Sequence, residues 1–242
     1  MDKLLNEPLF YIFFIYGTSF VVMAYIVFRG VKSATSIALV NSYYALAAFG
    51  LTHGLTELID WLRFIVKTSG SPEISALKYA SQCLLIVSFV VLLQFAVNLF
   101  TYRSERARPL RIAPAILFMV YLLALATMKV TDIAQAGLIA RYTFGFAGAL
   151  LSGIAMFGLA KSLREVLEAQ VVRGLVITGA GFCMYALVGG LVIKPVFGFP
   201  IQLFRAACAF TIAVSSFYIL GIFRAEHPAD RPLTVTSAAA QT

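Results

Sequence analysis

Three ionisable side chains lie close together within an otherwise apolar stretch of the chain. His53, Glu57 and Asp60 follow one another at spacings of four and three residues. A helix completes one turn every 3.6 residues, so these side chains share one helix face. Ionisable groups are costly inside a membrane and normally point into the helix bundle or a watered cavity. We therefore predict a sensing or binding site on this face.

A structural interpretation of the same residues stays open. Glu57 and Asp60 can mark the point where the helix leaves the membrane, and His53 can be a hydrogen-bonded packing residue. Their positions within the stretch 41–61 do not distinguish this interpretation from a binding site.

The composition is that of an integral membrane protein. Of the 242 residues, 61% are hydrophobic and only 12% are charged, whereas a soluble domain has about 25% charged residues. The mean hydropathy is +0.90. The net charge of +8 agrees with basic residues concentrated in cytoplasmic loops, so we expect the lipid bilayer and no nucleic acid as a partner.

The apolar residues form seven segments that are long enough to become membrane helices, since one span needs about 20 mostly apolar residues. We therefore expect an all-α, seven-helix transmembrane domain over residues 1–223. The proline-containing end, residues 224–242, lacks apolar periodicity, so we expect a disordered cytoplasmic tail. The seven segments are approximately Leu9–Phe28, Ile37–Leu58, Ala76–Phe100, Ala113–Met128, Leu138–Ala160, Leu175–Ile193 and Ile201–Phe223.

The distribution of basic residues predicts the orientation. If the first loop is cytoplasmic, eleven of the nineteen Lys and Arg residues lie on the cytoplasmic side. The positive-inside rule then places the N-terminus outside and the C-terminus in the cytoplasm.

This topology brings charges that are distant in sequence to one membrane level. Arg141 begins the fifth segment, and Arg205 lies one turn after Gln202 in the seventh. Because unpaired charges are costly in a low dielectric, we expect Glu57 or Asp60 to pair with one of these arginines. Such a cluster is a structural clasp, a pocket for a small polar or anionic ligand, or a proton-responsive element. The candidate ligand-binding residues are His53, Glu57, Asp60, Arg141, Gln202 and Arg205.

Small residues in the fifth segment predict close packing against another helix. Gly145, Ala149, Ser152 and Gly153, beside Gly148, form a small-xxx-small pattern that lets two backbones approach each other.

Patterns typical of enzymes and cofactor proteins do not occur. The sequence has no HExxH motif for zinc, only one histidine within a span for haem, and no lysine in the seventh segment for retinal. Cys83, Cys183 and Cys208 lack the spacing of metal ligands. We therefore expect no catalytic activity, no metal and no cofactor.

Three stretches of the chain, AAFGLTHGLTELIDW, ARYTFGFAGALLSG and FGFPIQLFRAACAF, carry a family likeness. In content and order they resemble the N-terminal seven-helix sensing region of bacterial sensor histidine kinases and diguanylate cyclases. The resemblance covers about Phe10 to Phe223. It implies a bacterial inner-membrane input module, whose matching polar positions here are His53, Gly54, Glu57, Arg141, Gln202 and Arg205.

The chain departs from this family pattern in two respects. Thr56 and Leu58 stand where the pattern has a second histidine and a tryptophan, and residues 224–242 are too few for a kinase or cyclase module. We therefore expect a stand-alone sensor or accessory protein that acts on a separate membrane or cytoplasmic protein, with oligomers possible. The alternatives are a structural or assembly subunit of a larger membrane complex and, ranked last, a transporter or membrane enzyme.

Overall fold

The computed structural model describes residues 8–32, 37–67, 74–102, 105–165, 167–192 and 199–225, and these residues are almost entirely helical. Each of the seven predicted apolar segments falls within a helical rod, except that Met128 and Val192 follow the ends of their helices and Ile193 lies outside the described residues. Two rods contain a π-helical turn (η2, η3), and one begins with a 3-10 turn (η1). The rods are α2 (Pro8–Val31), α3 (Ile37–Lys67), α4 (Ile74–Phe100), η1 (Glu105–Ile112) with α5 (Ala113–Thr127), α6 (Ile133–Ala140) with η2 (Arg141–Phe146) and α7 (Ala147–Ser162), α8 (Ala169–Tyr185) with η3 (Ala186–Leu191), and α9 (Ile201–Ala225).

Six of the rods are long and apolar enough to cross a membrane, which indicates a multi-pass membrane protein. The rod that does not meet this description is α3, which contains the predicted second segment and carries His53, Glu57 and Asp60. The prediction of membrane helices is thus confirmed for six segments. The predicted disordered tail lies, from residue 226 onward, outside the described residues.

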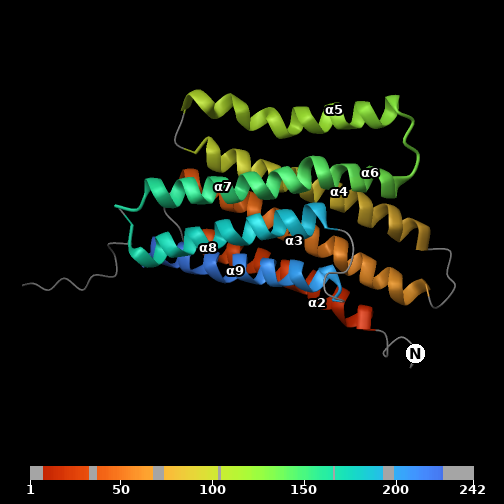
Figure 1. The fold of residues 1–242 in the computed structure, drawn as a ribbon, viewed down its shortest axis with the longest axis horizontal. Coiled ribbons are helices and arrows are strands. Elements are labelled where there is room, and N and C mark those ends of the chain that lie inside the picture. The colour runs from red at the N-terminus through yellow and green to blue at the C-terminus, as the bar shows by residue number, and fades with distance from the viewer. Residues whose placement is uncertain are drawn as a thin grey trace, which may run out of the picture.

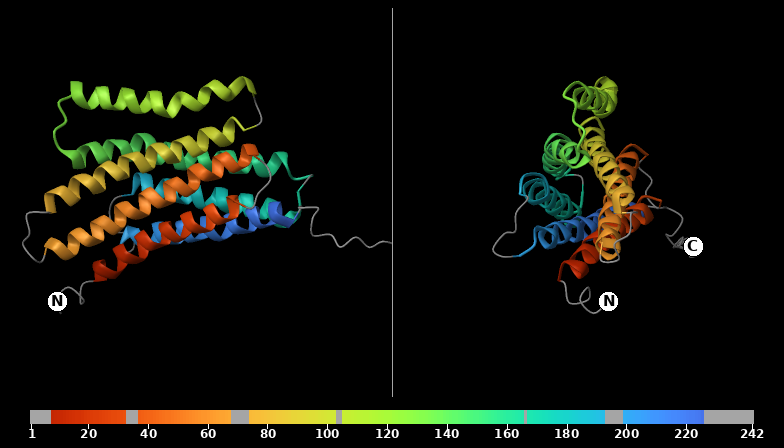
Figure 2. Two further views of the ribbon diagram at one scale, coloured as in Figure 1. Left: turned by 180° about the vertical axis from the view of Figure 1, so that it is seen from behind. Right: turned by 90° about the vertical axis from the view of Figure 1, so that its right-hand side faces the viewer.

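Six rods form a closed ring, and α5 lies outside it (Figure 1). Around the ring, α2 contacts α3, α3 contacts α4, α4 contacts α7, α7 contacts α8, α8 contacts α9, and α9 returns to α2. The end-on view in Figure 2 shows α5 set apart at one edge, where it packs on α4. The ring therefore has an interior that side chains from six different rods can reach.

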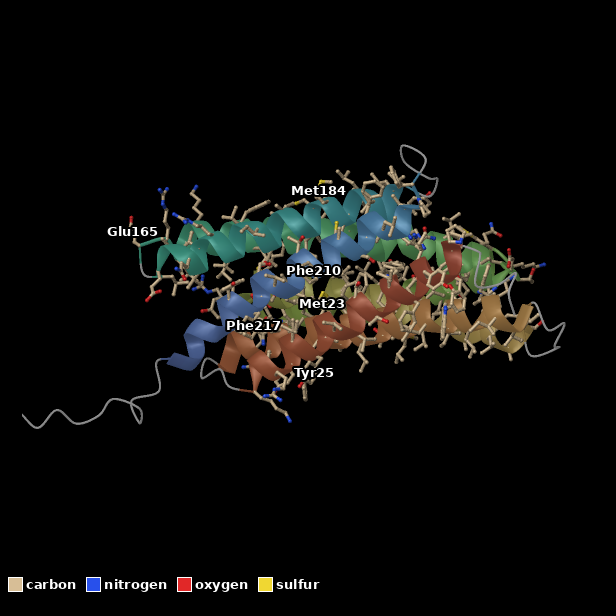
Figure 3. The ribbon with its side chains drawn as sticks, turned by 90° about the horizontal axis from the view of Figure 1, so that it is seen from below. Met23, Tyr25, Glu165, Met184, Phe210 and Phe217 are labelled. Atoms are coloured by element: carbon tan, nitrogen blue, oxygen red, sulfur yellow. The ribbon has the colours of Figure 1, made fainter. Side chains whose placement is uncertain are left out.

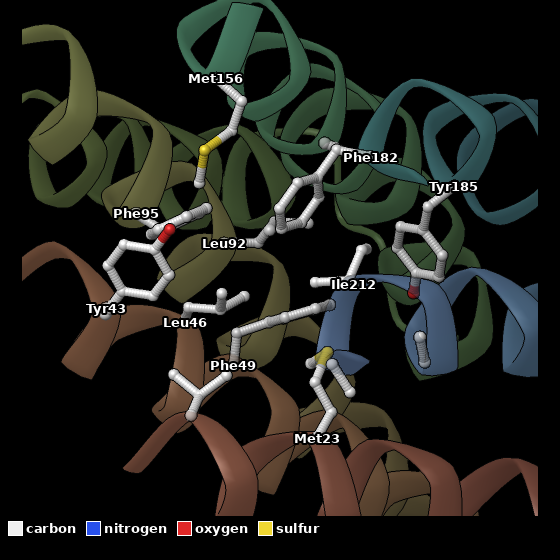
Figure 4. Close-up of a cluster of buried hydrophobic side chains, with 14 of the residues drawn as sticks. Met23, Tyr43, Leu46, Phe49, Leu92, Phe95, Met156, Phe182, Tyr185 and Ile212 are labelled. Atoms are coloured by element: carbon white, nitrogen blue, oxygen red, sulfur yellow. The ribbon is translucent and has the colours of Figure 1, made fainter. Parts of the chain in front are cut away.

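Large apolar side chains fill the interior of the ring (Figure 4). Met23 of α2, Phe49 of α3, Leu92 of α4 and Phe182 of α8 are each at most 1% exposed. They belong to one continuous cluster to which α7 and α9 also contribute. A dry apolar core of this kind makes any polar group within it depend on protein hydrogen bonds.

Glycines allow several of these rods to approach closely, as the small-residue pattern of the fifth segment predicted. A Cβ atom at Gly148 would lie 2.9 Å from the backbone nitrogen of Leu93, and one at Gly153 would lie 2.9 Å from the carbonyl oxygen of Gly179. A similar close approach joins α2 and α3, where a Cβ atom at Gly54 would lie 2.8 Å from the carbonyl oxygen of Gly17. Gly54 is therefore required for the packing that positions His53.

This contact predicts different outcomes for two glycine substitutions. Gly54→Ala should lower the free energy of unfolding by about 1–3 kcal/mol, because backbone on α2 blocks the added methyl group. Gly158→Ala, in helix α7 with open space around the glycine, should be neutral or should stabilise by up to about 1 kcal/mol through helix propensity. Unfolding in mixed micelles measures both values. Equal effects at the two positions would contradict the packing argument.

Candidate functional site

His53 is fully enclosed within the ring of helices and lies within hydrogen-bonding distance of side chains from three other rods. Its side chain lies among α2, α4 and α8 and the residue is 1% exposed. The Nε2 atom is 3.0 Å from the Tyr16 hydroxyl of α2 and 2.9 Å from the Tyr185 hydroxyl of α8. The Nδ1 atom is 3.0 Å from the Ser88 hydroxyl of α4. One imidazole thus connects four rods.

The hydrogen bonds of Ser88 identify the proton positions on this imidazole. The Ser88 hydroxyl donates to the carbonyl oxygen of Leu85 at 2.7 Å, so its oxygen is left to accept from His53. The Nδ1 atom therefore carries the proton and donates to Ser88. In the neutral imidazole, Nε2 then has one lone pair, which accepts a hydrogen bond from the hydroxyl of Tyr16 or Tyr185.

Aromatic rings surround the imidazole. The ring centroids of Phe20, Phe49 and Phe89 lie 4.7, 5.3 and 5.5 Å from that of His53, and the Phe49 ring is stacked on it. These rings exclude water and leave the two tyrosines and the serine as the hydrogen-bonding partners of the imidazole.

Glu57 is buried next to this network without a hydrogen bond of its own. Its side chain is 8% exposed, and its Oε1 atom is 3.9 Å from His53 Nε2, which is beyond hydrogen-bonding distance. Among the described residues no side chain or backbone group donates to the carboxyl. Its oxygens are not among the fully enclosed side-chain atoms that lack a partner, so the carboxyl keeps a small accessible surface and is the open acceptor of the site.

Arg205 does not pair with an acid, contrary to the sequence-based prediction. It is 5% exposed and donates from Nε to the carbonyl oxygen of Val188 at 2.8 Å and from Nη2 to that of Val192 at 3.0 Å. Arg141 likewise donates to the carbonyl oxygen of Gly189 at 3.1 Å. Neither arginine forms an ion pair within the described part of the chain. The predicted pairing with Glu57 or Asp60 is therefore wrong.

The arginines bind carbonyls because of the way in which the α8–η3 rod ends. The last carbonyl groups of any helix lack intrahelical partners and carry partial negative charge. Val188 and Gly189 lie in η3, the last turn of its rod, and Val192 follows it. Arg141 from η2 and Arg205 from α9 thus hold this end of the rod through its carbonyl groups, and we call this arrangement the carbonyl clamp. Their charges nevertheless interact electrostatically with Glu57 across the site.

The remaining candidate residues lie outside the His53 network. Asp60 accepts hydrogen bonds from Arg63 and, at 2.8 Å, from Ser81, so its carboxylate has partners on α3 and α4. Gln202 is partly buried in the first turn of α9 and makes no hydrogen bond to another described residue. The structure therefore brings together His53, Glu57, Arg141 and Arg205, and leaves Asp60 and Gln202 at the margin.

Sequence reasoning missed the hydroxyl partners of His53. Tyr16, Ser88 and Tyr185 lie in apolar segments. The sequence does not distinguish the two tyrosines from the other nine in the chain. The available signal was their position near the middle of an apolar span, where a hydroxyl needs a partner. Within the described residues no group of three or more His, Cys, Asp and Glu side chains is arranged to hold a metal ion.

No family model, curated protein or solved structure matches the chain. The likeness to bacterial sensing regions rests on the quoted residues alone, and the polar site must be interpreted from its own geometry.

The carbonyl clamp predicts that a charge swap will fail. Arg205→Ala should lower the free energy of unfolding by about 1.5–3 kcal/mol or more, because this is the range for one hydrogen bond to a charged group and two are lost. Combining Glu57→Arg with Arg205→Glu should restore none of this loss, since a carboxylate cannot donate to carbonyls. Arg106→Ala, at an exposed arginine, is the control and should change stability by less than about 0.5 kcal/mol. Recovery of stability in the double variant would restore the ion-pair interpretation.

Proposed function

We propose that the protein is a seven-helix membrane sensor or accessory protein of the bacterial inner membrane, with α3 as the seventh span. With 31 residues, α3 is about 46 Å long at 1.5 Å per residue, and the hydrocarbon core is about 30 Å thick. Its low hydropathy has a physical reason, because His53 and Glu57 face the ring interior rather than lipid. The concentration of basic residues in the loops supports an outer N-terminus and a cytoplasmic C-terminus.

The observation that carries the proposal is the buried Glu57 carboxyl without a hydrogen-bond donor, 3.9 Å from His53 Nε2. An ionised, unpaired carboxylate costs several kcal/mol in a low dielectric. A proton or a small polar ligand removes that cost. Because the imidazole is enclosed by rings and protein hydroxyls, we identify the proton as the simplest stimulus that can reach this pair.

Proton uptake on His53 would change the hydrogen bonds between helices. A protonated Nε2 donates rather than accepts, so Tyr16 and Tyr185 must turn their hydroxyl protons elsewhere. The imidazolium also becomes the partner of Glu57. The rearrangement acts on α2, α3 and α8 together, which gives a local event a route to the ends of the helices.

Charged and titratable groups from several elements balance this site. The guanidinium groups of Arg141 and Arg205 act electrostatically on His53, and the Glu57 Oε1 atom lies 3.9 Å from its Nε2 atom. Helix α4 contributes the hydroxyl of Ser88 and the uncharged ring of Phe89. The groups that face the pair are Tyr16 from α2, Asp60 from α3, Arg141 from η2, Tyr185 from α8 and Arg205 from α9.

Spin labels on two exposed positions test this proposal. Tyr11→Cys on α2 and Leu191→Cys on η3, which are 49% and 47% exposed, are labelled in a protein whose native cysteines are replaced by alanine. Electron–electron distance measurements in lipid nanodiscs compare about pH 8 with about pH 5, a range that spans ordinary histidine titration. We expect the distance distribution to shift on acidification, because Nε2 changes from acceptor to donor toward the Tyr16 hydroxyl of α2 and the Tyr185 hydroxyl of α8.

Two carboxylate variants separate the proposed role from a general effect of pH. Glu57→Gln should abolish the shift, because the imidazolium loses its counter-ion. Asp60→Asn, at a carboxylate that already has partners on α3 and α4, should retain it. A pH-independent distance in the parent protein, or an unchanged shift in Glu57→Gln, would exclude the His53–Glu57 pair as the responding element.

A structural subunit of a larger membrane complex is the second candidate function. It is favoured by α5, because only 11% of the most apolar stretch of its rod is buried, against 56% for the corresponding stretch of α9. Such a helix has most of its surface free for a neighbouring membrane protein. Co-purification from native membranes discriminates the candidates: a kinase, cyclase or response regulator supports the sensor, and a stoichiometric large complex supports the subunit.

A further inference from the structure

A groove runs along the outside of the bundle between α8 and α9. Figure 3 shows the two helices side by side, with Phe210 and Phe217 on α9 and Glu165 beyond the start of α8. The groove has a volume of about 450 Å³. It is lined by Ile177 on α8 and by Phe210, Val214 and Tyr218 on α9, all of which are more than a third exposed. Its walls are therefore apolar and open to the surroundings of the bundle.

The floor of the groove is closed and has no free polar group. A Cβ atom at Gly174 would lie 3.0 Å from Ile219 Cγ1, so the two helices touch there. The hydroxyls of Thr178 and Ser215 lie 2.7 Å apart and also bond to backbone carbonyls of their own helices. An occupant of the groove consequently meets apolar surface along most of its length.

One end of the groove carries a positive charge that has no partner among the residues that the structure describes. Arg173 lines the groove, is exposed, and makes no hydrogen bond or ion pair with any described residue. Gln170 lies one turn earlier on the same helix face. Both residues are in the first turns of α8, where the helix dipole adds positive potential. This end is therefore suited to an anion.

We propose that the groove binds one anionic phospholipid, with its phosphate at Arg173 and Gln170 and an acyl chain along the apolar walls. The walls on α9 extend over about 12 Å from Tyr218 to Phe210 at 1.5 Å per residue. A soluble anion would gain nothing from these walls, and a zwitterionic phospholipid would bring its own ammonium group beside the Arg173 guanidinium, which weakens the attraction. Basic residues at the ends of membrane helices attract anionic lipid head groups in this way.

A tryptophan reporter in the groove tests the proposal without altering the His53 network. Tyr218→Trp is combined with Trp61→Phe, since Trp61 is the one tryptophan of the chain. In phosphatidylcholine bilayers that contain a minor fraction of brominated phosphatidylglycerol, quenching reports the local lipid composition. We expect phosphatidylglycerol to be enriched about fivefold over the bulk, the effect of one basic residue near a membrane surface. Met119→Trp on α5, at a residue 64% exposed, should report the bulk composition.

Two arginine variants identify the head-group contact. Arg173→Gln should return the reporter to the bulk composition, and Arg164→Gln, at an exposed arginine outside the groove, should leave the enrichment unchanged. Native mass spectrometry of the protein with its natural Tyr218 and Trp61 should likewise show phosphatidylglycerol retained over phosphatidylcholine, and this preference lost in Arg173→Gln. Equal quenching by both lipids, enrichment that survives Arg173→Gln, or a reporter that no lipid quenches because protein covers it would each overturn the proposal.

Discussion

The structure depends on one constraint, which is that an imidazole enclosed in an apolar bundle must find a partner for each of its nitrogens. His53 satisfies this constraint by connecting α3 to Tyr16 of α2, Ser88 of α4 and Tyr185 of α8. Hydroxyl groups from three other rods therefore lie within hydrogen-bonding distance of the two nitrogens of one imidazole. Close contact between Gly17 and Gly54 makes this geometry possible, because it brings α2 and α3 together at the depth of the imidazole.

The two arginines complete the same polar region by a different physical principle. Arg141 and Arg205 bind the unpaired carbonyl groups at the end of the α8–η3 rod, the rod that also carries Tyr185. The arginines thus hold the end of this rod, and His53 holds the Tyr185 hydroxyl on the same rod. Glu57 interacts electrostatically with both guanidinium groups but has no hydrogen bond from a described residue. Its carboxyl is therefore the group in this region whose bonding changes most readily.

The sequence predicted more about the position of the site than about its bonding. The spacing of His53 and Glu57 indicated one helix face, and the topology brought Arg141 and Arg205 to the same level. The partners of the arginines were predicted wrongly, because the free carbonyls arise only where the α8–η3 rod ends against η2 and α9. Sequence spacing says nothing about that contact. Tyr16 and Tyr185 were missed because a hydroxyl in an apolar span does not reveal which distant residue it faces.

The protonation state of His53 tests this account most directly. The chain has two histidines, so His227→Gln leaves His53 as the single reporter, and nitrogen-15 NMR of labelled histidine in nanodiscs then distinguishes its two ring nitrogens. At neutral pH the account predicts a neutral imidazole with the proton on Nδ1 and with Nε2 accepting a tyrosine hydroxyl. A proton on Nε2 alone, or a rapid exchange between the two neutral forms, would contradict the hydrogen-bond network on which the proposed function rests.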